Sequence, residues 1–145
     1  ELRARYVVTG KAQIEMRLLG ALGDDSLRAA EAALCAAEQG LFLEYQEALF
    51  HAWRDRDADA YSTEELVKLA GTVGLDRQAL RRCLDSGAKR SELEKNMRMA
   101  KVDGVHTLPA VIVNRVKIEG YRPLDAYRVI ERELPISKCI GARFE

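Results

Sequence analysis

Three cysteines and two histidines are the residues of this 145-residue chain best suited to chemistry. Cys35, Cys83 and Cys139 are each dozens of positions apart, so the chain contains no Cys-x-x-Cys redox pair. His51 and His106 have no cysteine or carboxylate at metal-ligand spacing, and we therefore expect no metal site and no cofactor.

The surroundings of each cysteine suggest a different state. Cys35 lies in an apolar, alanine-rich run, which predicts an unreactive thiol in the core. Cys83 follows two arginines that could lower its pKa, but it shares an apolar helix face with Leu80, which favours core packing. Cys139 follows the last predicted helix and is the thiol most expected to be exposed, either free or cross-linked to another chain.

The loop that ends at Pro109 is the most informative segment. Proline is tolerated at the first residue of a strand, where its missing N–H does no harm. If the bond before it were cis, the main chain of Leu108 would face outward and could pair with an extended peptide. Local sequence alone favours an ordinary trans proline, because only about 5–6% of X–Pro bonds are cis in folded proteins.

We take His106, Thr107, Leu108 and Pro109 as the candidate substrate-binding residues and assign no catalytic residue. His106 could tune the pKa of a neighbouring thiolate. A solvated loop histidine is the alternative, and it is favoured by the local sequence.

The hydrophobic pattern predicts the elements that position this loop. Residues 2–8 are typical of a helix end closed by Gly10, and period-two alternation predicts a strand over 12–19. Helices are expected over 26–39, 42–53, 62–73, 76–86 and 91–102. Two short strands, 109–113 and 116–120, form a hairpin that precedes a last helix over 123–132.

Composition narrows the class of protein. Lys and Arg (23) balance Asp and Glu (23), which argues against a nucleic-acid-binding protein. No run approaches the ~18 apolar residues of a membrane span. The length fits one domain.

The ordered set of segments resembles the DsbA-like thiol–disulfide oxidoreductases, and the resemblance covers nearly the whole chain. It is carried by Ser26–Phe50, Ala70–Asp76, Arg82–Gly87, Gly104–Asn114 and Glu119–Tyr121. The resemblance implies an α/β, thioredoxin-like fold with an all-helical insertion, and Pro109 as a cis-proline. A single domain, 1–145, would hold a core at about 1–22 and 103–134, an insertion at about 23–102 and a tail at 135–145.

The chain departs from the family pattern at three places. Thr107-Leu108-Pro109 stands where Gly-Thr-Pro or Gly-Val-Pro is usual, and Asn114-Arg115 replaces Asn-Gly at the hairpin turn. The Cys-x-x-Cys expected after the first strand is not contained in this chain: either it lies just upstream of Glu1, or the parent protein never had it. The first strand and the start of the first helix are likewise absent, which predicts an exposed sheet edge. We expect either that the missing part is present but disordered, or that another chain, such as a second copy in a homo-oligomer, covers that edge.

The resemblance implies a domain that oxidises, reduces or isomerises protein disulfides, although this chain alone is expected to be inactive. Its partners would be protein or peptide dithiol and disulfide substrates and a redox-recycling partner, in an extracytoplasmic, periplasmic or membrane-anchored parent. A redox-inactive thioredoxin-like module that binds peptides or partner chains is the alternative. A glutathione-activating transferase of the same fold is a third interpretation.

Overall fold

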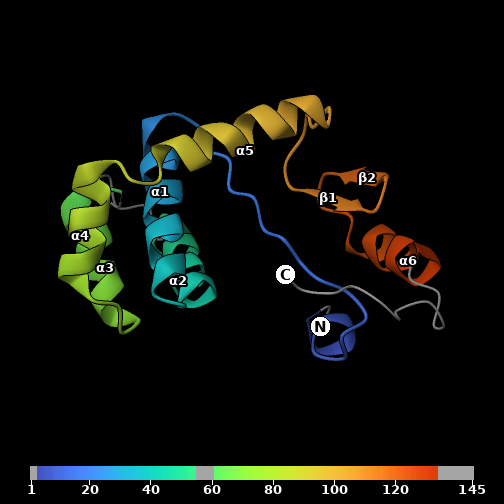
Figure 1. The fold of residues 1–145 in the computed structure, drawn as a ribbon, viewed down its shortest axis with the longest axis horizontal. Helices are drawn as coiled ribbons and strands as arrows, with labels where there is room; N and C mark the ends of the chain where they lie inside the picture. Colours follow the sequence, from blue (N-terminus) through green and yellow to red (C-terminus); the bar gives the residue numbers. More distant parts are fainter. Residues whose placement is uncertain (1–2, 55–60, 134–145) are drawn as a thin grey trace, which may run out of the picture. The chain divides into compact units, whose positions relative to one another are not determined.

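The computed structural model describes residues 3–54 and 61–133 (Figure 1). Helices dominate these residues, and the one β-sheet in them is a two-stranded hairpin. In chain order the elements are a π-helical turn at Arg3–Val7, α1 (Asp24–Glu38), α2 (Phe42–Arg54), α3 (Thr63–Thr72), α4 (Arg77–Ser86), α5 (Arg90–Val102), β1 (Ala110–Val113), β2 (Val116–Glu119) and α6 (Pro123–Glu133).

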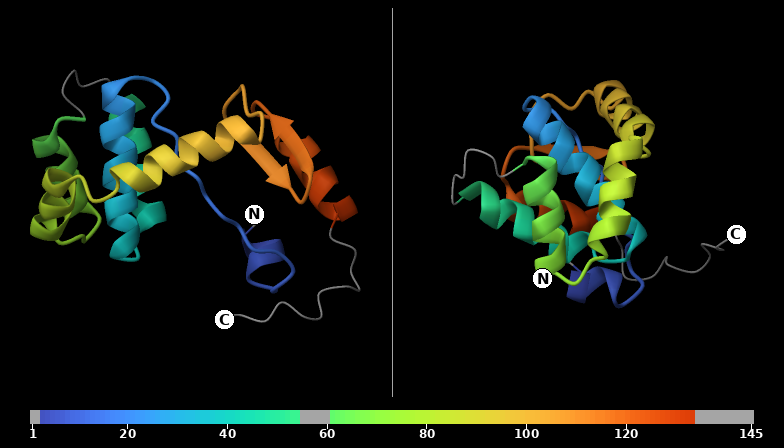
Figure 2. Two further views of the ribbon diagram at one scale, coloured as in Figure 1. Left: turned by 45° about the horizontal axis from the view of Figure 1, so that its top comes forward. Right: turned by 90° about the vertical axis from the view of Figure 1, so that its left-hand side faces the viewer.

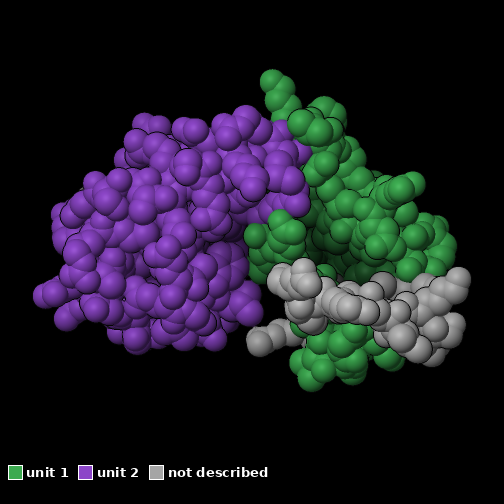
Figure 3. Space-filling view, viewed as in Figure 1, with its two compact units in different colours: residues 1–16, 101–145 green, residues 17–100 purple. Residues whose placement is uncertain are grey.

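The chain divides into two compact units, coloured separately in Figure 3. Unit 1 takes residues 1–16 and 101–145, and unit 2 takes residues 17–100. Unit 1 lies close to the predicted thioredoxin-like core and unit 2 close to the predicted helical insertion. That the two form a single domain stays a prediction. Leu18 belongs to unit 2 rather than to the core segment, because it packs against the buried face of α1.

The helices of unit 2 begin where side chains can cap their free N–H groups. The Ser62 hydroxyl accepts a hydrogen bond from the Glu65 N–H (3.4 Å) at the start of α3. The Asp76 carboxylate accepts hydrogen bonds from the N–H groups of Gln78 (2.8 Å) and Ala79 (3.1 Å) at the start of α4. These bonds hold the pKa of Asp76 below its ordinary value. The caps confirm the predicted starts of both helices.

The core of unit 2 lies between α1, α2, α3 and α4. Alanines on α1 leave room for neighbouring helices to approach closely, and Tyr45, Leu66 and Leu80 are fully buried there. The Tyr45 hydroxyl donates a hydrogen bond to the Leu66 carbonyl (2.9 Å), so its polar end is satisfied in the interior. Burial raises the pKa of Tyr45 above its ordinary value.

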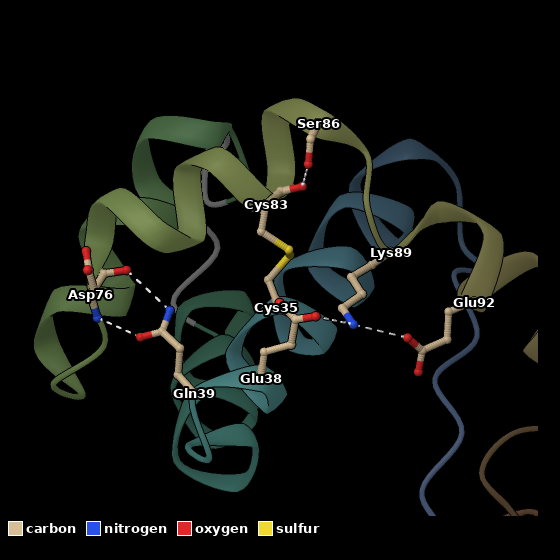
Figure 4. Close-up of a disulfide and its surroundings, with 8 residues drawn as sticks. All are labelled: Cys35, Glu38, Gln39, Asp76, Cys83, Ser86, Lys89 and Glu92. Atoms are coloured by element: carbon tan, nitrogen blue, oxygen red, sulfur yellow. Dashed lines mark hydrogen bonds and ion pairs between the residues drawn. A yellow bond between two sulfur atoms is a disulfide. The ribbon is translucent and has the colours of Figure 1, made fainter.

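Cys35 and Cys83 form a disulfide, which corrects the prediction that both are unpaired core thiols. The bond joins α1 to α4, with Cα atoms 6.0 Å apart (Figure 4). Cys35 is 2% exposed, so its predicted burial is right and only its chemical state was wrong. The 48 residues between the two cysteines hide the pairing from any local pattern, because only the packing of α1 on α4 brings them together.

Charged side chains join the start of α5 to α1. Lys89 lies 2.7 Å from a Glu38 carboxylate oxygen and 3.4 Å from Glu92 (Figure 4). The hydrogen bond to Glu38 is the main cause that raises the pKa of Lys89. Arg90 Nε donates to the buried carboxylate of Glu31 at 3.1 Å, and thereby pairs the one buried charged side chain among the described residues.

The strand predicted over 12–19 is wrong: residues 12–21 have no regular secondary structure. Ile14 and Met16 are about half exposed, so the alternating residues do not share a buried face. A strand needs a neighbour for its N–H and C=O groups, and within the described residues no strand pairs with this segment.

Unit 1 contains the predicted hairpin and last helix. β1 and β2 are antiparallel, with Ala110 opposite Glu119 and Val113 opposite Val116. Helix α6 packs on both strands and buries Ala126 and Ile130; the left view of Figure 2 shows it in red beside the orange hairpin. None of the described helices has the length and apolarity that crossing a bilayer requires.

Candidate functional site

The candidate substrate loop runs from the end of α5 to the start of β1, in unit 1. All four predicted residues, His106, Thr107, Leu108 and Pro109, are exposed on this loop. The Pro109 carbonyl accepts a hydrogen bond from the Gly120 N–H (2.8 Å), which joins the end of the loop to the end of β2. The loop is therefore tied to the hairpin at its last residue.

The peptide bond between Leu108 and Pro109 is cis, the isomer that the resemblance implies. Leu108 as a whole residue is 48% exposed. Within residues 3–54 and 61–133, the main-chain N–H and C=O of Leu108 have no hydrogen-bond partner. An exposed residue with both groups free can accept an extended peptide as a short β-bridge.

Glu119 holds the part of the loop that precedes Leu108. Its Oε1 accepts hydrogen bonds from the N–H groups of His106 (2.5 Å) and Thr107 (2.9 Å). Main-chain donors stabilise the carboxylate form, so these two bonds are the main causes that hold the pKa of Glu119 below its ordinary value. Lys117 and His106 lower it further by their charge. The carboxylate is thus ionised at neutral pH.

Lys117 makes a second attachment between β2 and the loop. Its ammonium group donates a hydrogen bond to the Gly104 carbonyl and lies 3.7 Å from Glu119 Oε2. Gly104 has φ +63°, a conformation that other residues rarely adopt, and a Cβ there would meet Lys117 Nζ at 3.4 Å. Residues two apart on a strand share a face, so Lys117 and Glu119 reach the loop from the same side of β2.

The hairpin turn has Asn114-Arg115 where Asn-Gly is usual, and these two residues join β1 directly to β2. Asn114 adopts φ 55°, and asparagine is among the few non-glycine residues that tolerate this left-handed region. Its side-chain amide also donates to the Glu133 carbonyl at the end of α6 (3.5 Å). Arg115 is not among the residues with positive φ, so the second turn position does not require a glycine, and Val113 still pairs with Val116.

The loop 106–109 brings together exposed residues and main-chain groups, and it contains no cysteine. Cys35 and Cys83 lie in unit 2 and are bonded to each other, and Cys139 lies outside the described residues. The sequence analysis singled out residues 106–109, which stay a prediction as a site, and did not name Glu119 or Lys117, which contact this loop. The period-two spacing of two charges on a short strand was the signal that could have indicated them.

One comparison with known proteins is positive. The family model described as a DSBA-like thioredoxin domain matches residues 7–129, which is most of the chain. Neither the curated proteins nor the solved structures contain a significant match. The helical unit inserted before a hairpin and a C-terminal helix agrees with a thioredoxin-like fold that carries a helical insertion. With its family model covering the insertion and the hairpin alike, the chain belongs to the DSBA-like thioredoxin domain family.

Proposed function

We propose that this domain serves protein thiol–disulfide exchange by aligning an extended substrate peptide on residues 106–109. The observation that supports the proposal most strongly is Leu108, an exposed residue whose main-chain N–H and C=O have no partner among the described residues, on a loop held by Glu119. One hydrogen bond donated by its N–H and one accepted by its C=O would fix the peptide without reading its sequence.

The reacting thiols come from outside the 145 residues, since the chain has no Cys-x-x-Cys. The first thiolate of such a pair attacks one sulfur of a substrate disulfide, forms a mixed disulfide and releases the other sulfur as a thiolate. The second thiolate then attacks the first cysteine's sulfur in the mixed disulfide, which breaks that bond and releases the substrate's remaining sulfur as a thiolate. The substrate gains two electrons, the pair is oxidised to a disulfide, and a redox partner must reduce it again. In the oxidising direction the same steps run in reverse.

We propose an extracytoplasmic location for the protein. Disulfides form and persist in oxidising compartments and are rare in the reducing cytosol. The Cys35–Cys83 bond therefore supports this location from the chain's own residues.

Insulin-disulfide reduction by the full-length gene product, followed as B-chain precipitation in dithiothreitol, tests the proposal. We expect clear acceleration, and we expect Leu108→Asp to slow it because a charge then stands where the peptide backbone docks. Leu124→Asp is the matched control, since Leu124 is also an exposed leucine (71%) but lies on α6. Cys139→Ser should leave the rate unchanged. Absence of any acceleration would refute exchange activity.

A redox-inactive module that binds peptides is the second candidate. It is favoured by the state of the cysteines: the two that are described form a disulfide, and Cys35 is 2% exposed. A protein that fails to reduce insulin but still binds a peptide at Leu108 would support this candidate.

A further inference from the structure

Two side chains on one face of β2 reach the main chain of the substrate loop. Glu119 accepts hydrogen bonds from two consecutive N–H groups, those of His106 and Thr107, and Lys117 donates to the Gly104 carbonyl. The Lys117–Glu119 contact of 3.7 Å links the two attachments. These are tertiary contacts, because 12 and 13 positions separate the bonded residues.

The opposite face of β2 contributes a side chain to the apolar core. Ile118 is buried (9% exposed), whereas Lys117 and Glu119 remain partly accessible on either side of it in sequence. Alternation along the strand therefore separates a core-facing residue from the two that hold the loop. Glu119 could be exchanged without opening the apolar core of unit 1.

The consequence concerns Leu108, the next residue after Thr107. Two bonds to one carboxylate oxygen fix the direction of the main chain immediately before Leu108, so its N–H and C=O are presented in one orientation. A loop without this anchor would occupy several orientations, and only some of them could pair with an extended peptide. When the loop is already ordered before the peptide arrives, binding does not have to include the conformational entropy lost on ordering it.

We propose that Glu119 is a positioning residue for the substrate, which sets the orientation of Leu108 through His106 and Thr107. This inference rests on the proposed function and adds to it the residue that sets the register of the peptide. Lys117 supports Glu119 from the same strand.

The test uses the 15N-labelled chain and an insulin B-chain peptide whose cysteines are S-methylated, so that only binding is measured. Glu119→Ala removes the anchor and Glu119→Gln keeps an acceptor without the charge. Glu94→Gln is the matched control, because Glu94 is exposed on α5 and contacts Arg98 rather than the loop. If about one molecule in ten retains the competent loop after release, Kd for the peptide rises about tenfold in Glu119→Ala. Glu119→Gln should rescue part of that loss, and Glu94→Gln should not differ from the unmodified chain.

A pH titration separates positioning from general stability. The charged groups that act on Glu119 are Lys117 and His106, and among the described residues α6 adds none. In the unmodified chain the amide proton shifts of His106 and Thr107 should follow the Glu119 carboxylate and change only at acidic pH. Peptide affinity should fall over the same range, and both changes should disappear in Glu119→Gln.

The outcomes distinguish this inference from the proposed function. Equal peptide affinity for Glu119→Ala and the unmodified chain would overturn the positioning role and leave peptide binding intact. The positioning role would also be overturned if the amide proton shifts of His106 and Thr107 did not change with pH in the unmodified chain. If the unmodified chain binds no peptide although the amide shifts titrate as expected, the anchor exists but the proposed function fails, and the positioning role for a substrate fails with it.

Discussion

Loss of the Cys35–Cys83 disulfide should destabilise the helical unit strongly. The bond closes a loop with a sequence separation of 48 residues, and the chain-entropy relation assigns such a loop about 4 kcal/mol at 25 °C. With a urea dependence near 2 kcal/mol per molar, the unfolding midpoint should fall by about 2 M. The perturbation is the double substitution Cys35→Ala and Cys83→Ala, which keeps small apolar side chains in the interior.

Urea unfolding followed by circular dichroism, with and without dithiothreitol, measures the effect. The reductant should lower the midpoint of the unmodified chain and of Cys139→Ala, but not that of the double variant. Thiol titration of the denatured, non-reduced chain should find at most one free thiol among the three cysteines. Three free thiols in the unmodified chain would refute the disulfide. A urea midpoint that is the same with and without dithiothreitol would refute its contribution to stability.

Three further substitutions test separate contacts. Arg90→Ala leaves the buried Glu31 carboxylate without its partner and should lower the free energy of unfolding by about 1–3 kcal/mol, measured in urea; an unchanged midpoint would contradict the pairing. Tyr45→Phe removes the hydrogen bond to Leu66 and should cost about 1 kcal/mol, and it should remove one tyrosine with a raised pKa from an alkaline absorbance titration. Asp76→Ala should lower the melting temperature at neutral pH. Because the folded pKa of Asp76 lies below its ordinary value of 3.8, that difference should shrink as the pH falls below 3.8; a difference that is constant from pH 7 to 2 would exclude the cap.

The helices and the hairpin could be predicted because their signals are local. Ser62 and Asp76 mark helix starts by the bonds that their own side chains make. Asn114 permits a tight turn between two short apolar runs. In each case the residue that determines the structure lies within a few positions of the structure that it determines.

The features that could not be predicted depend on contacts between distant segments. Cys35 and Cys83 meet only because α1 packs on α4, and Glu119 reaches His106 only after the hairpin has folded back. For residues 12–19 the local pattern is present, but the predicted strand is not. Its alternation is typical of a strand, but a strand also requires a neighbour, which the described residues do not provide.

The central claim is that Leu108 presents free main-chain groups to an extended peptide. A 15N chemical-shift titration of the whole 145-residue chain with the S-methylated insulin B-chain peptide measures this most directly. We expect a saturable shift that is largest for the Leu108 amide, with that proton protected from solvent exchange in the complex. A Leu108 amide that neither shifts nor gains protection, while the peptide binds elsewhere or does not bind at all, would contradict the account.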